Sequence, residues 1–318
     1  MTTQTKDRPS APPGARTEES GSTQRRSADG VTIVVPAYNE EGGIGGVVDR
    51  LCALELGVPT ELLIVDDGSS DGTAAALVEL GARHPALTVV RHRENSGYGA
   101  ALKTGFARAR HDVVVITDAD GTYPESSIAE LLERIDDGAD MAVGSRTGGD
   151  VHIPLIRRPA KAFLRWMASF LAGTPIPDLN SGLRAFRREF VLAYLPILPQ
   201  GFSFTTTITL AALTNGHAVD YVRINYAARE GRSKIRPVRD TLGFLALILR
   251  TVLYFNPLKV FYPLAGVMVI PLALLLYRDL FLGDQPNLGD STVVLFVAVV
   301  QILSVGLLAD LIEKKARL

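Results

Sequence analysis

The sequence predicts a Rossmann-like α/β protein with a doubly wound, mostly parallel sheet, followed by interfacial helices and a C-terminal hairpin of two transmembrane helices. Between residues 31 and 235, short and nearly continuous β-branched apolar runs alternate with segments of helical length. This pattern is typical of parallel strands covered by helices on both faces. Two long uncharged runs follow near the C terminus, and each is long enough for a hydrocarbon core of about 30 Å.

The composition excludes several classes of function. The 318 residues carry 33 Lys and Arg against 34 Asp and Glu, a formal net charge of −1, and a single cysteine, Cys52. A chain this close to neutral lacks the basic excess of a general nucleic-acid binder. One cysteine allows neither an internal disulfide nor a Cys-rich zinc site. At roughly 150 residues per domain, the length allows about two structural units.

Residues 1–30 are expected to form a disordered tail. They hold very few apolar side chains, so ordering them would bury too little surface to offset the loss of conformational entropy. The tail also lacks the apolar segment of a secretory signal peptide. We therefore expect the folded part to lie in the cytosol.

Residues 31–235 are expected to form one α/β domain. The segments 42–56 and 71–83 are long enough for the helices that connect parallel strands. In a doubly wound sheet, ligands bind at the carboxyl ends of the strands. The expected strands are Val31–Val35, Leu62–Val65, Thr88–Val90, Val113–Ile116 and Met141–Val143.

Two segments are expected to lie on a membrane surface as amphipathic helices. One stripe of the first segment is basic and the other is apolar and aromatic; the stripes are Arg158, Lys161 and Arg165, and Phe163, Trp166, Met167 and Phe170. An ordinary surface helix packed on the sheet is the alternative. The second segment, 236–258, is apolar except for one face, and Arg250 on that face argues against a third full span. That face holds Arg239, Gly243, Ala246 and Arg250.

Residues 259–318 are expected to form the transmembrane hairpin and a short basic tail in the cytosol. The uncharged runs are 261–277 and 291–309. Lys259 precedes the first, basic residues follow the second, and the connection 278–290 holds three Asp against one Arg. By the positive-inside rule, both ends then lie in the cytosol. The alternative is a pair of helices buried in a large soluble core.

The end of the first strand differs from a dinucleotide-binding fingerprint. It reads PAYNE at residues 36–40, without a glycine turn. Gly97-Tyr98-Gly99 lacks the third glycine of the fingerprint, since position 102 is Leu102. These glycines alone are more typical of tight turns.

The second strand runs into VDDGS at residues 65–69. A carboxylate at this edge of a central strand can accept hydrogen bonds from a nucleoside base or ribose. The same segment also has a structural interpretation, because Ser70 or Asp71 can cap the following helix. We take Asp67 as the ligand contact and Asp71 as the cap.

The fourth strand ends in Asp118-Ala119-Asp120, the sole Asp-x-Asp of the chain. Two carboxylates at this spacing can converge on one point, where their repulsion favours a divalent cation. Oxygen ligands suit Mg²⁺ or Mn²⁺, and such an ion would bridge a substrate diphosphate. The position at a strand end makes this short motif informative.

Taken in order, the three motifs at 36–40, 65–69 and 118–120 resemble the family-two glycosyltransferases with the GT-A fold, over residues 31–235. Further segments, followed by a membrane hairpin, are similar to the branch that acts on polyprenyl phosphates, such as dolichyl-phosphate mannosyltransferases and undecaprenyl-phosphate glucosyltransferases. These segments are GSR at 144–146, DLNSGLR at 178–184 and REGRSK at 229–234.

The resemblance implies a role for each matching residue. The nucleotide sugar would be held by Pro36, Tyr38, Glu40, Asp67 and Asp118. The metal and diphosphate would engage Asp118 and Asp120, with Thr122 as a poorer metal ligand where mannosyltransferases often have Gln. The phosphates of donor and lipid would be held by Arg146, Arg229 and Lys234, with Arg232 as an alternate contact.

The implied reaction is metal-dependent transfer of a hexose, mannose or glucose, with inversion, from a nucleoside-diphosphate sugar to a polyprenyl phosphate. A lipid phosphate is already ionised near neutral pH, so no general base is obligatory. The five histidines are accordingly interpreted as surface or structural residues. Asp178 stands where relatives that act on alcohols have a base; here it either orients an Arg or Lys or caps a helix.

Two other functions remain open from the sequence. One is a transferase acting on another lipid or a polysaccharide, although the Gln-x-x-Arg-Trp pattern of synthases is missing at Arg165-Trp166. The other is a non-catalytic membrane adaptor that binds a nucleotide sugar. The preferred interpretation is an integral membrane enzyme with a cytosolic catalytic domain, in the plasma membrane of a prokaryote.

Overall fold

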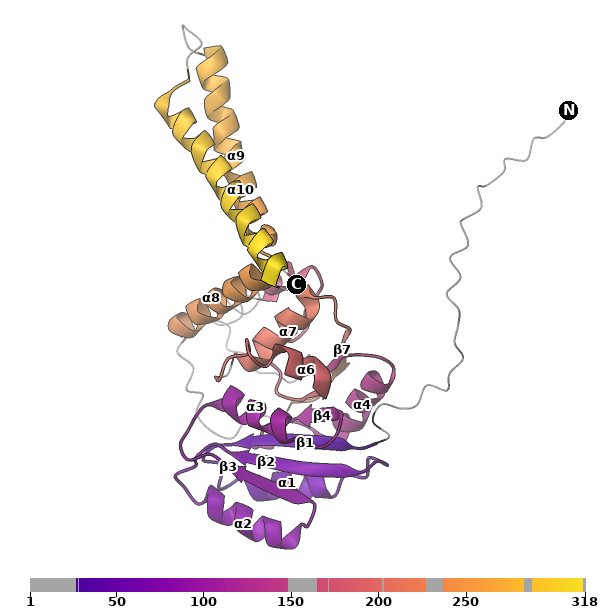
Figure 1. The fold of residues 1–318 in the computed structure, drawn as a ribbon. Helices are drawn as coiled ribbons and strands as arrows, with labels where there is room; N and C mark the ends of the chain where they lie inside the picture. Colours follow the sequence, from indigo (N-terminus) through magenta and orange to yellow (C-terminus); the bar gives the residue numbers. More distant parts are fainter. Residues whose placement is uncertain are drawn as a thin grey trace, which may run out of the picture.

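The computed structural model describes residues 27, 29–147, 165–170, 172–201, 203–226, 237–282 and 288–316. For residues 237–244 and 316, the description covers the backbone alone. The expected tail 1–30 falls outside these residues except for Ser27, Asp29 and Gly30. Figure 1 shows an α/β body from which a helical hairpin projects, with a third long helix across its base.

A single mixed sheet of seven strands, in the order β3-β2-β1-β4-β6-β5-β7, forms the centre of the body. Neighbouring strands are parallel except for β6, which is antiparallel to both β4 and β5. The predicted doubly wound, mostly parallel sheet is confirmed, and each of the five expected runs is a strand. The strands are β1 Val31–Ala37, β2 Thr60–Asp66, β3 Leu87–Arg91, β4 Val113–Ile116, β5 Met141–Ser145, β6 Arg184–Arg187 and β7 Val219–Arg223.

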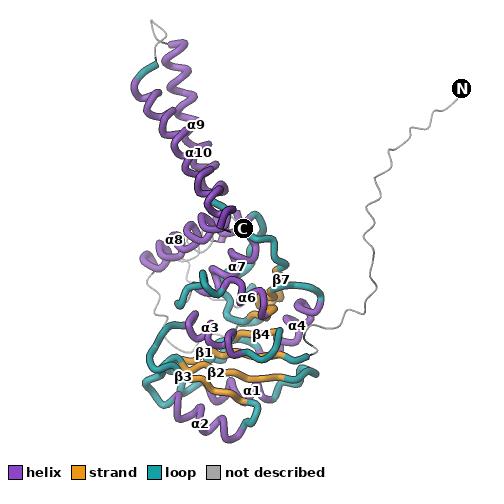
Figure 2. Tube along the Cα trace, in the orientation of Figure 1, coloured by secondary structure: helices purple, strands orange, loops and turns teal. Residues whose placement is uncertain are grey.

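Helices cover both faces of the sheet (Figure 2). Alternate side chains of β1 point to opposite faces of the sheet. Ile33 and Val35 pack on the face covered by α1, α2 and α4, and Val34 packs on the face covered by α3, α6 and α7. These are α1 Ile44–Cys52, α2 Thr73–Arg83, α3 Tyr98–Arg108, α4 Ile128–Asp136, α6 Arg188–Tyr194 and α7 Phe204–Thr214, with the 3₁₀ turn η1 Glu125–Ser127 before α4. Strands buried on both faces explain the continuous apolar runs in the sequence.

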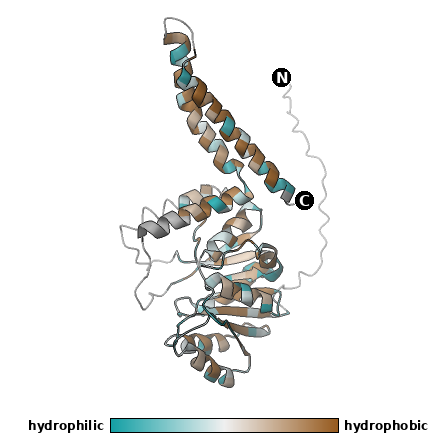
Figure 3. Ribbon diagram, turned by 60° about the vertical axis from the view of Figure 1, so that its left-hand side comes forward, coloured by the Kyte–Doolittle hydropathy of each residue, from teal (hydrophilic) through white to brown (hydrophobic). Residues whose placement is uncertain are grey.

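Two C-terminal helices are long and apolar enough to cross a membrane. They are α9, Leu258–Tyr277, which continues into the π-helical turn η3, Arg278–Leu282, and α10, Asp290–Ala316. Only 11% and 17% of their most apolar stretches are buried, so the alternative of two helices inside a soluble core is wrong. Figure 3 shows both helices mostly in brown, the colour of hydrophobic residues, away from the body.

At the far end of the hairpin, one buried carboxylate connects α9 to the start of α10. Asp279 accepts hydrogen bonds from the backbone N–H of Gly289, 2.8 Å away, and from the Thr292 hydroxyl, and it pairs with Arg278 at 2.7 Å. The C terminus returns to the base of the hairpin beside the body (Figure 1). Both ends of the hairpin therefore lie on the side of the α/β domain, as the charge distribution predicts.

The helix at the base is α8, Pro237–Phe255. Its Ile248 and Val252 are buried in a cluster with Leu210 of α7 and Met167, while Arg250 is exposed. Of the other expected amphipathic helix, Arg158, Lys161 and Phe163 lie outside the described residues. In its described part, 165–170, Met167 faces the body, and it therefore does not share the exposed stripe predicted for it with Trp166 and Phe170.

Candidate functional site

The carboxyl ends of β1, β2, β4 and β5 bring most of the predicted site residues to one edge of the sheet. Parallel register pairs Ala37 of β1 with Asp66 of β2, so the loops that follow these strands lie side by side. Tyr38 follows β1 with 45% of its surface exposed, and Glu40 is half-buried. Asp118 and Asp120 follow β4, and Arg146 follows β5. The expected clustering at the strand ends is therefore present among the described residues.

Pro36 occupies a position in β1 where a missing N–H is tolerated. It pairs with Val65 of β2, but the pairing of β1 with β4 ends earlier, at Val34 and Ile116. Proline is accepted in a sheet where no ladder hydrogen bond is lost. Its buried ring therefore sets the direction of the chain as it leaves the sheet toward Tyr38.

The β1 and β2 loops are tied together by side chains. Asn39, at a positive φ of 55°, accepts a hydrogen bond from the Ser70 N–H at 2.9 Å, and its own N–H donates to the Ser69 hydroxyl at 3.0 Å. The Glu40 N–H donates to Thr73 at 2.9 Å. Asp71 accepts from the Thr73 N–H at 3.0 Å and so holds the turn before α2. The cap position itself is occupied by Gly72, without a side-chain cap bond, so Asp71 precedes the cap position expected for it.

The carboxylate of Asp67 forms hydrogen bonds within the protein. Its two oxygens accept hydrogen bonds from the N–H groups of Ser96 and Gly97, at 2.9 and 2.7 Å, and one of them lies 2.7 Å from His92 Nδ1. The side chain is 3% exposed. Asp67 thus holds the loop before α3, and a direct contact with a nucleoside stays a prediction. His92 completes this contact, which agrees with its interpretation as a structural histidine.

Asp118 is oriented by Tyr98, which is not among the predicted site residues. The Tyr98 hydroxyl, at the start of α3, donates to Asp118 Oδ1 at 3.0 Å. Burial, and after it the charge of Asp118, raises the pKa of Tyr98 well above its usual value, so the phenol keeps the proton that it donates. On the other side, Gly182 leaves no room for a side chain, because a Cβ there would lie 2.6 Å from Asp118.

Thr122 donates two hydrogen bonds to Asp120. The Thr122 hydroxyl donates to Asp120 Oδ1 at 2.6 Å, and the Thr122 N–H donates to the same oxygen at 3.2 Å. Thr122 is 3% exposed. In this structure Thr122 orients Asp120, and its role as a metal ligand stays a prediction.

The residues at the end of β4 fit a hard divalent cation. Asp118 and Asp120 offer carboxylate oxygens, the ligand type that Mg²⁺ and Mn²⁺ prefer. No group of three or more His, Cys, Asp or Glu side chains in the described residues is arranged to hold a metal ion. A cation held by two carboxylates would take its other ligands from substrate phosphates and water, which is the usual arrangement for Mg²⁺.

The half-buried Arg146 and the buried Asp178 form a bidentate ion pair. Arg146 Nε lies 2.7 Å from Asp178 Oδ2 and its Nη2 lies 2.9 Å from Oδ1, while the Arg146 N–H donates to Oδ2 at 3.1 Å. Burial alone would raise the pKa of Asp178, but the hydrogen bonds and charge of Arg146 outweigh it and lower that pKa. Of the two interpretations of Asp178, the geometry matches the orienting one.

The other face of the Arg146 guanidinium is covered by an aromatic ring. The guanidinium carbon of Arg146 lies 5.3 Å from the centre of the Tyr226 ring. The Tyr226 ring packs edge-on against the Tyr123 ring, with 5.1 Å between the ring centres. Arg146 is thus a fixed cation at the edge of the site. Arg229, Arg232 and Lys234, the other cations expected there, lie outside the described residues.

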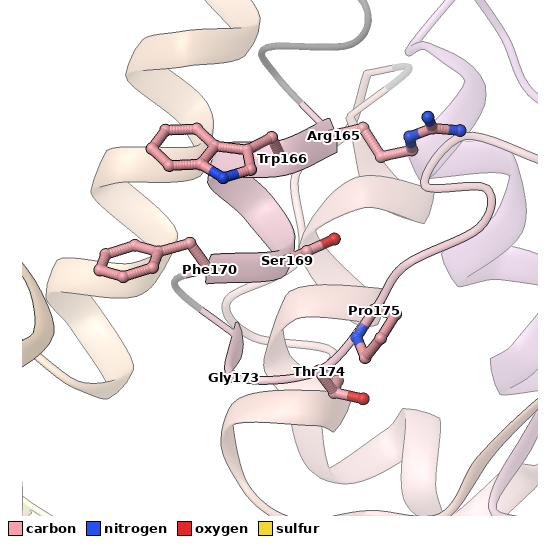
Figure 4. A pocket seen from close by; sticks show the side chains of 7 residues that line it. All are labelled: Arg165, Trp166, Ser169, Phe170, Gly173, Thr174 and Pro175. Atoms are coloured by element: carbon pink, nitrogen blue, oxygen red, sulfur yellow. The ribbon is translucent and has the colours of Figure 1, made fainter.

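A cavity of about 570 Å³ is lined by seven residues between Arg165 and Pro175 (Figure 4). Figure 4 shows Trp166 and Phe170 on one side of segment 165–170 and Arg165 on the other; the two rings stack at 5.8 Å. Trp166 is 62% exposed and Phe170 is 54% exposed. An exposed aromatic pair beside a cation is typical of residues at a membrane interface.

The chain is similar to several known proteins. Residues 32–195 match the family described as Glycosyl transferase family 2. The polyprenol monophosphomannose synthase of Mycolicibacterium smegmatis is 34% identical over 238 residues, covering 70% of this chain and 88% of that protein. The undecaprenyl-phosphate 4-deoxy-4-formamido-L-arabinose transferase of Pectobacterium carotovorum is 32% identical over 302 residues, covering 89% and 88%.

A solved structure shares the fold. Glucosyl-3-phosphoglycerate synthase from Mycobacterium tuberculosis, crystallised with Mn²⁺, uridine diphosphate and phosphoglyceric acid, is similar with a TM-score of 0.55 and 24% sequence identity. The likeness covers 72% of this chain and 81% of that one. The GT-A fold expected from the motifs is confirmed.

Replacing Asp178 with Asn should destabilise the protein, because it leaves the half-buried Arg146 cation without its anion. The expected loss of unfolding free energy at pH 7 is about 3 kcal/mol, measured by denaturant unfolding in detergent. Since the folded pKa of Asp178 is lowered, the wild-type advantage is complete above the ordinary carboxyl pKa near 4 and shrinks as the pH falls below it.

The exposed acid Asp137 provides the control for this substitution. Asp137→Asn should leave the unfolding free energy within about 0.5 kcal/mol of wild type. A loss in Asp178→Asn no larger than that in Asp137→Asn would contradict the importance of the ion pair.

Proposed function

This chain belongs to glycosyl transferase family 2, and on that premise we propose that it transfers a sugar from a nucleoside-diphosphate sugar to a polyprenyl phosphate at a membrane surface. Family membership makes it a glycosyltransferase and favours an enzyme over a non-catalytic adaptor. Its relatives from M. smegmatis and P. carotovorum carry polyprenol and undecaprenyl phosphate in their names. The observation that carries the proposal is that the fixed Arg146 cation and the carboxylates Asp118 and Asp120 follow strands at one edge of the sheet, in a chain with an apolar hairpin.

We propose a hexose, mannose or glucose, as the transferred sugar. Support comes from the mannose-transferring relative of M. smegmatis, while the relative of P. carotovorum transfers an arabinose derivative. Direct displacement at the anomeric carbon inverts its configuration. In that step the bond from this carbon to the donor diphosphate breaks, and a bond to an oxygen of the acceptor phosphate forms.

The donor is proposed to bind where the β1, β2 and β4 loops meet. Pro36, Tyr38, Glu40, Asp67 and Asp118 would contact the nucleotide sugar. Asp118 and Asp120, with Thr122, would hold Mg²⁺ or Mn²⁺. A bound divalent ion supplies positive charge that stabilises the departing diphosphate.

The acceptor phosphate is proposed to meet the cations on the β5 side. Arg146 is already fixed by Asp178 and Tyr226, so binding an anion there requires little reorganisation. Burial opposes the charge of Arg146, but the bonds with Asp178 more than compensate and raise its pKa. The cation is therefore permanent, and Arg229 and Lys234 would add to it. Asp178 orients Arg146 and takes no proton.

The expected test incubates membranes that contain the protein with labelled nucleotide sugars and polyprenyl phosphate, and then identifies the labelled lipid. Transfer should need Mg²⁺ or Mn²⁺ and stop with a chelator. Asp120→Asn should lower the rate at least about 100-fold, because the diphosphate loses charge stabilisation. Asp137→Asn should retain the wild-type rate.

Two outcomes would contradict this assignment. An unaffected rate in Asp120→Asn would exclude the metal site. A wild-type chain that binds nucleotide sugars without transferring any of them would favour an adaptor.

The pH dependence tests the nucleophile. A phosphate monoester has its second pKa near 6, and the lowered pKa of Asp178 keeps the pair with Arg146 intact there. The transfer rate should therefore fall about tenfold per pH unit below pH 6 and stay level from pH 7 to 8, measured at saturating donor. A rate that does not change between pH 5 and 7 would contradict the dianion of the lipid phosphate as nucleophile, because the monoanion prevails at pH 5.

The catalytic domain is proposed to lie in the cytosol, against the plasma membrane of a prokaryote. A reporter enzyme that is active only outside the cytosol should be active when inserted after Leu288, between α9 and α10. The same reporter should be inactive when fused after Leu318. The reverse pattern, or activity at both positions, would contradict the proposed orientation.

A further inference from the structure

Arg184 is a completely buried arginine that the proposed mechanism leaves unused. It begins β6 in the middle of the sheet, in register with Ile116 of β4 and Val143 of β5, and its exposed fraction is 0%. Taking a charged side chain out of water is costly unless the charge is well satisfied. An apolar side chain of similar volume would fill the same space without that cost. The charge of Arg184 therefore calls for an explanation.

The guanidinium of Arg184 is satisfied by neutral oxygens. Its Nε donates to the carbonyl of Ser181 at 2.8 Å, and its Nη2 donates to the carbonyl of Leu179 at 2.9 Å. Its Nη1 donates to the Thr209 hydroxyl at 2.6 Å. Within the described part of the chain, no carboxylate forms an ion pair with it. Arg184 therefore holds the turn that precedes it instead of neutralising an acid.

That turn, residues 178–183, touches both halves of the site. At its beginning, Asp178 holds Arg146. Near its end, the Gly182 N–H donates to the Tyr123 hydroxyl at 2.7 Å, and Gly182 lies against Asp118. The two carbonyls bound by Arg184 lie between these points. A shift of the turn would therefore move Asp178, and with it Arg146, relative to Asp118.

Thr209 connects this arrangement to the membrane side of the molecule. Its hydroxyl accepts from Arg184 and donates to the Thr205 carbonyl at 2.7 Å within α7. The next residue, Leu210, packs against Ile248 and Val252 of α8. The turn is thus anchored, through Arg184, to the helix on which α8 lies.

We propose that Arg184 is a positioning residue for the transfer reaction. Its hydrogen bonds to Leu179, Ser181 and Thr209 fix turn 178–183. The fixed turn holds Asp178 in place, and Asp178 in turn orients Arg146 toward the acceptor phosphate at a set distance from Asp118. This inference rests on the proposed function for the identity of the acceptor. The holding of the turn is independent of it and can be measured without activity.

Thr209→Val and Thr207→Val form a matched pair of variants. Both threonines are buried in α7, but the Thr207 hydroxyl has no hydrogen-bond partner among the described residues. Thr209→Val removes one of the three oxygen acceptors of Arg184 and keeps the side-chain shape, while Met141 Sδ remains 3.5 Å from Nη1. Thr207→Val makes the same chemical change without touching Arg184.

The first measurement is amide hydrogen exchange in the full-length protein. Thr209→Val should speed exchange of the 178–183 amides about tenfold, since a hydrogen bond to a charged group is lost, and Thr207→Val should leave it at the wild-type rate. Equal exchange of the turn in the two variants would overturn the proposal.

The second measurement separates the chemical step from donor binding. In Thr209→Val, kcat with saturating lipid should fall about tenfold, while the Kd for UDP or GDP, whichever binds the wild type, changes less than twofold. An unchanged kcat in a variant with a loosened turn would reduce Arg184 to a purely structural residue and overturn the proposal.

Arg184→Lys tests whether geometry or charge is responsible. Lysine keeps the charge but lacks the rigid fork that reaches three acceptors, so kcat should fall at least as far as in Thr209→Val. Wild-type kcat in Arg184→Lys would overturn the proposal. If the wild-type chain transfers no sugar at all, the proposed function fails, while the exchange comparison still decides whether Arg184 holds the turn.

Discussion

Parallel strands end at the same edge of a sheet, and the site of this protein depends on that constraint. β1, β2 and β4 deliver Tyr38, Asp67 and Asp118 to one edge because their registers match. The antiparallel β6 brings one more segment to this edge. Since it runs back between β4 and β5, the turn before it arrives at the edge that the parallel strands leave.

Hydrogen-bond donors hold four carboxylates of the site. Asp67 accepts from backbone N–H groups, Asp118 from Tyr98, Asp120 from Thr122, and Asp178 from Arg146. Such contacts reduce the repulsion among carboxylates and fix their directions before substrate binds. A preorganised polar site needs little reorganisation when charge develops on the leaving group.

α8, at the base of the apolar hairpin, and the sheet form one connected structure. α8 packs on α7 through Leu210, and α7 reaches the site turn through Thr209. The exposed aromatic pair Trp166 and Phe170 lies near the same base. An enzyme whose acceptor is a lipid phosphate needs its site at a set height above the bilayer, and this chain of contacts provides a physical means of holding it there.

The sequence by itself determined the features that depend on local pattern. The five apolar strands, the two apolar helices and the position of Asp118 and Asp120 at a strand end follow from periodicity, run length and charge. β6 and β7 were not predicted, because Arg184–Arg187 and Val219–Arg223 are short strands with charged residues that interrupt the apolar pattern.

Only the tertiary structure decided which side chains meet. The partnerships of Arg146 with Asp178, of Tyr98 with Asp118 and of Asp67 with the loop before α3 join residues from 20 to 32 positions apart. A local pattern contains no record of such pairs, since they arise when strands and turns pack together. For the same reason, the sequence shows Arg184 only as the last residue of the DLNSGLR segment. Its complete burial and its hydrogen bonds to Leu179 and Ser181 show that it holds the site turn.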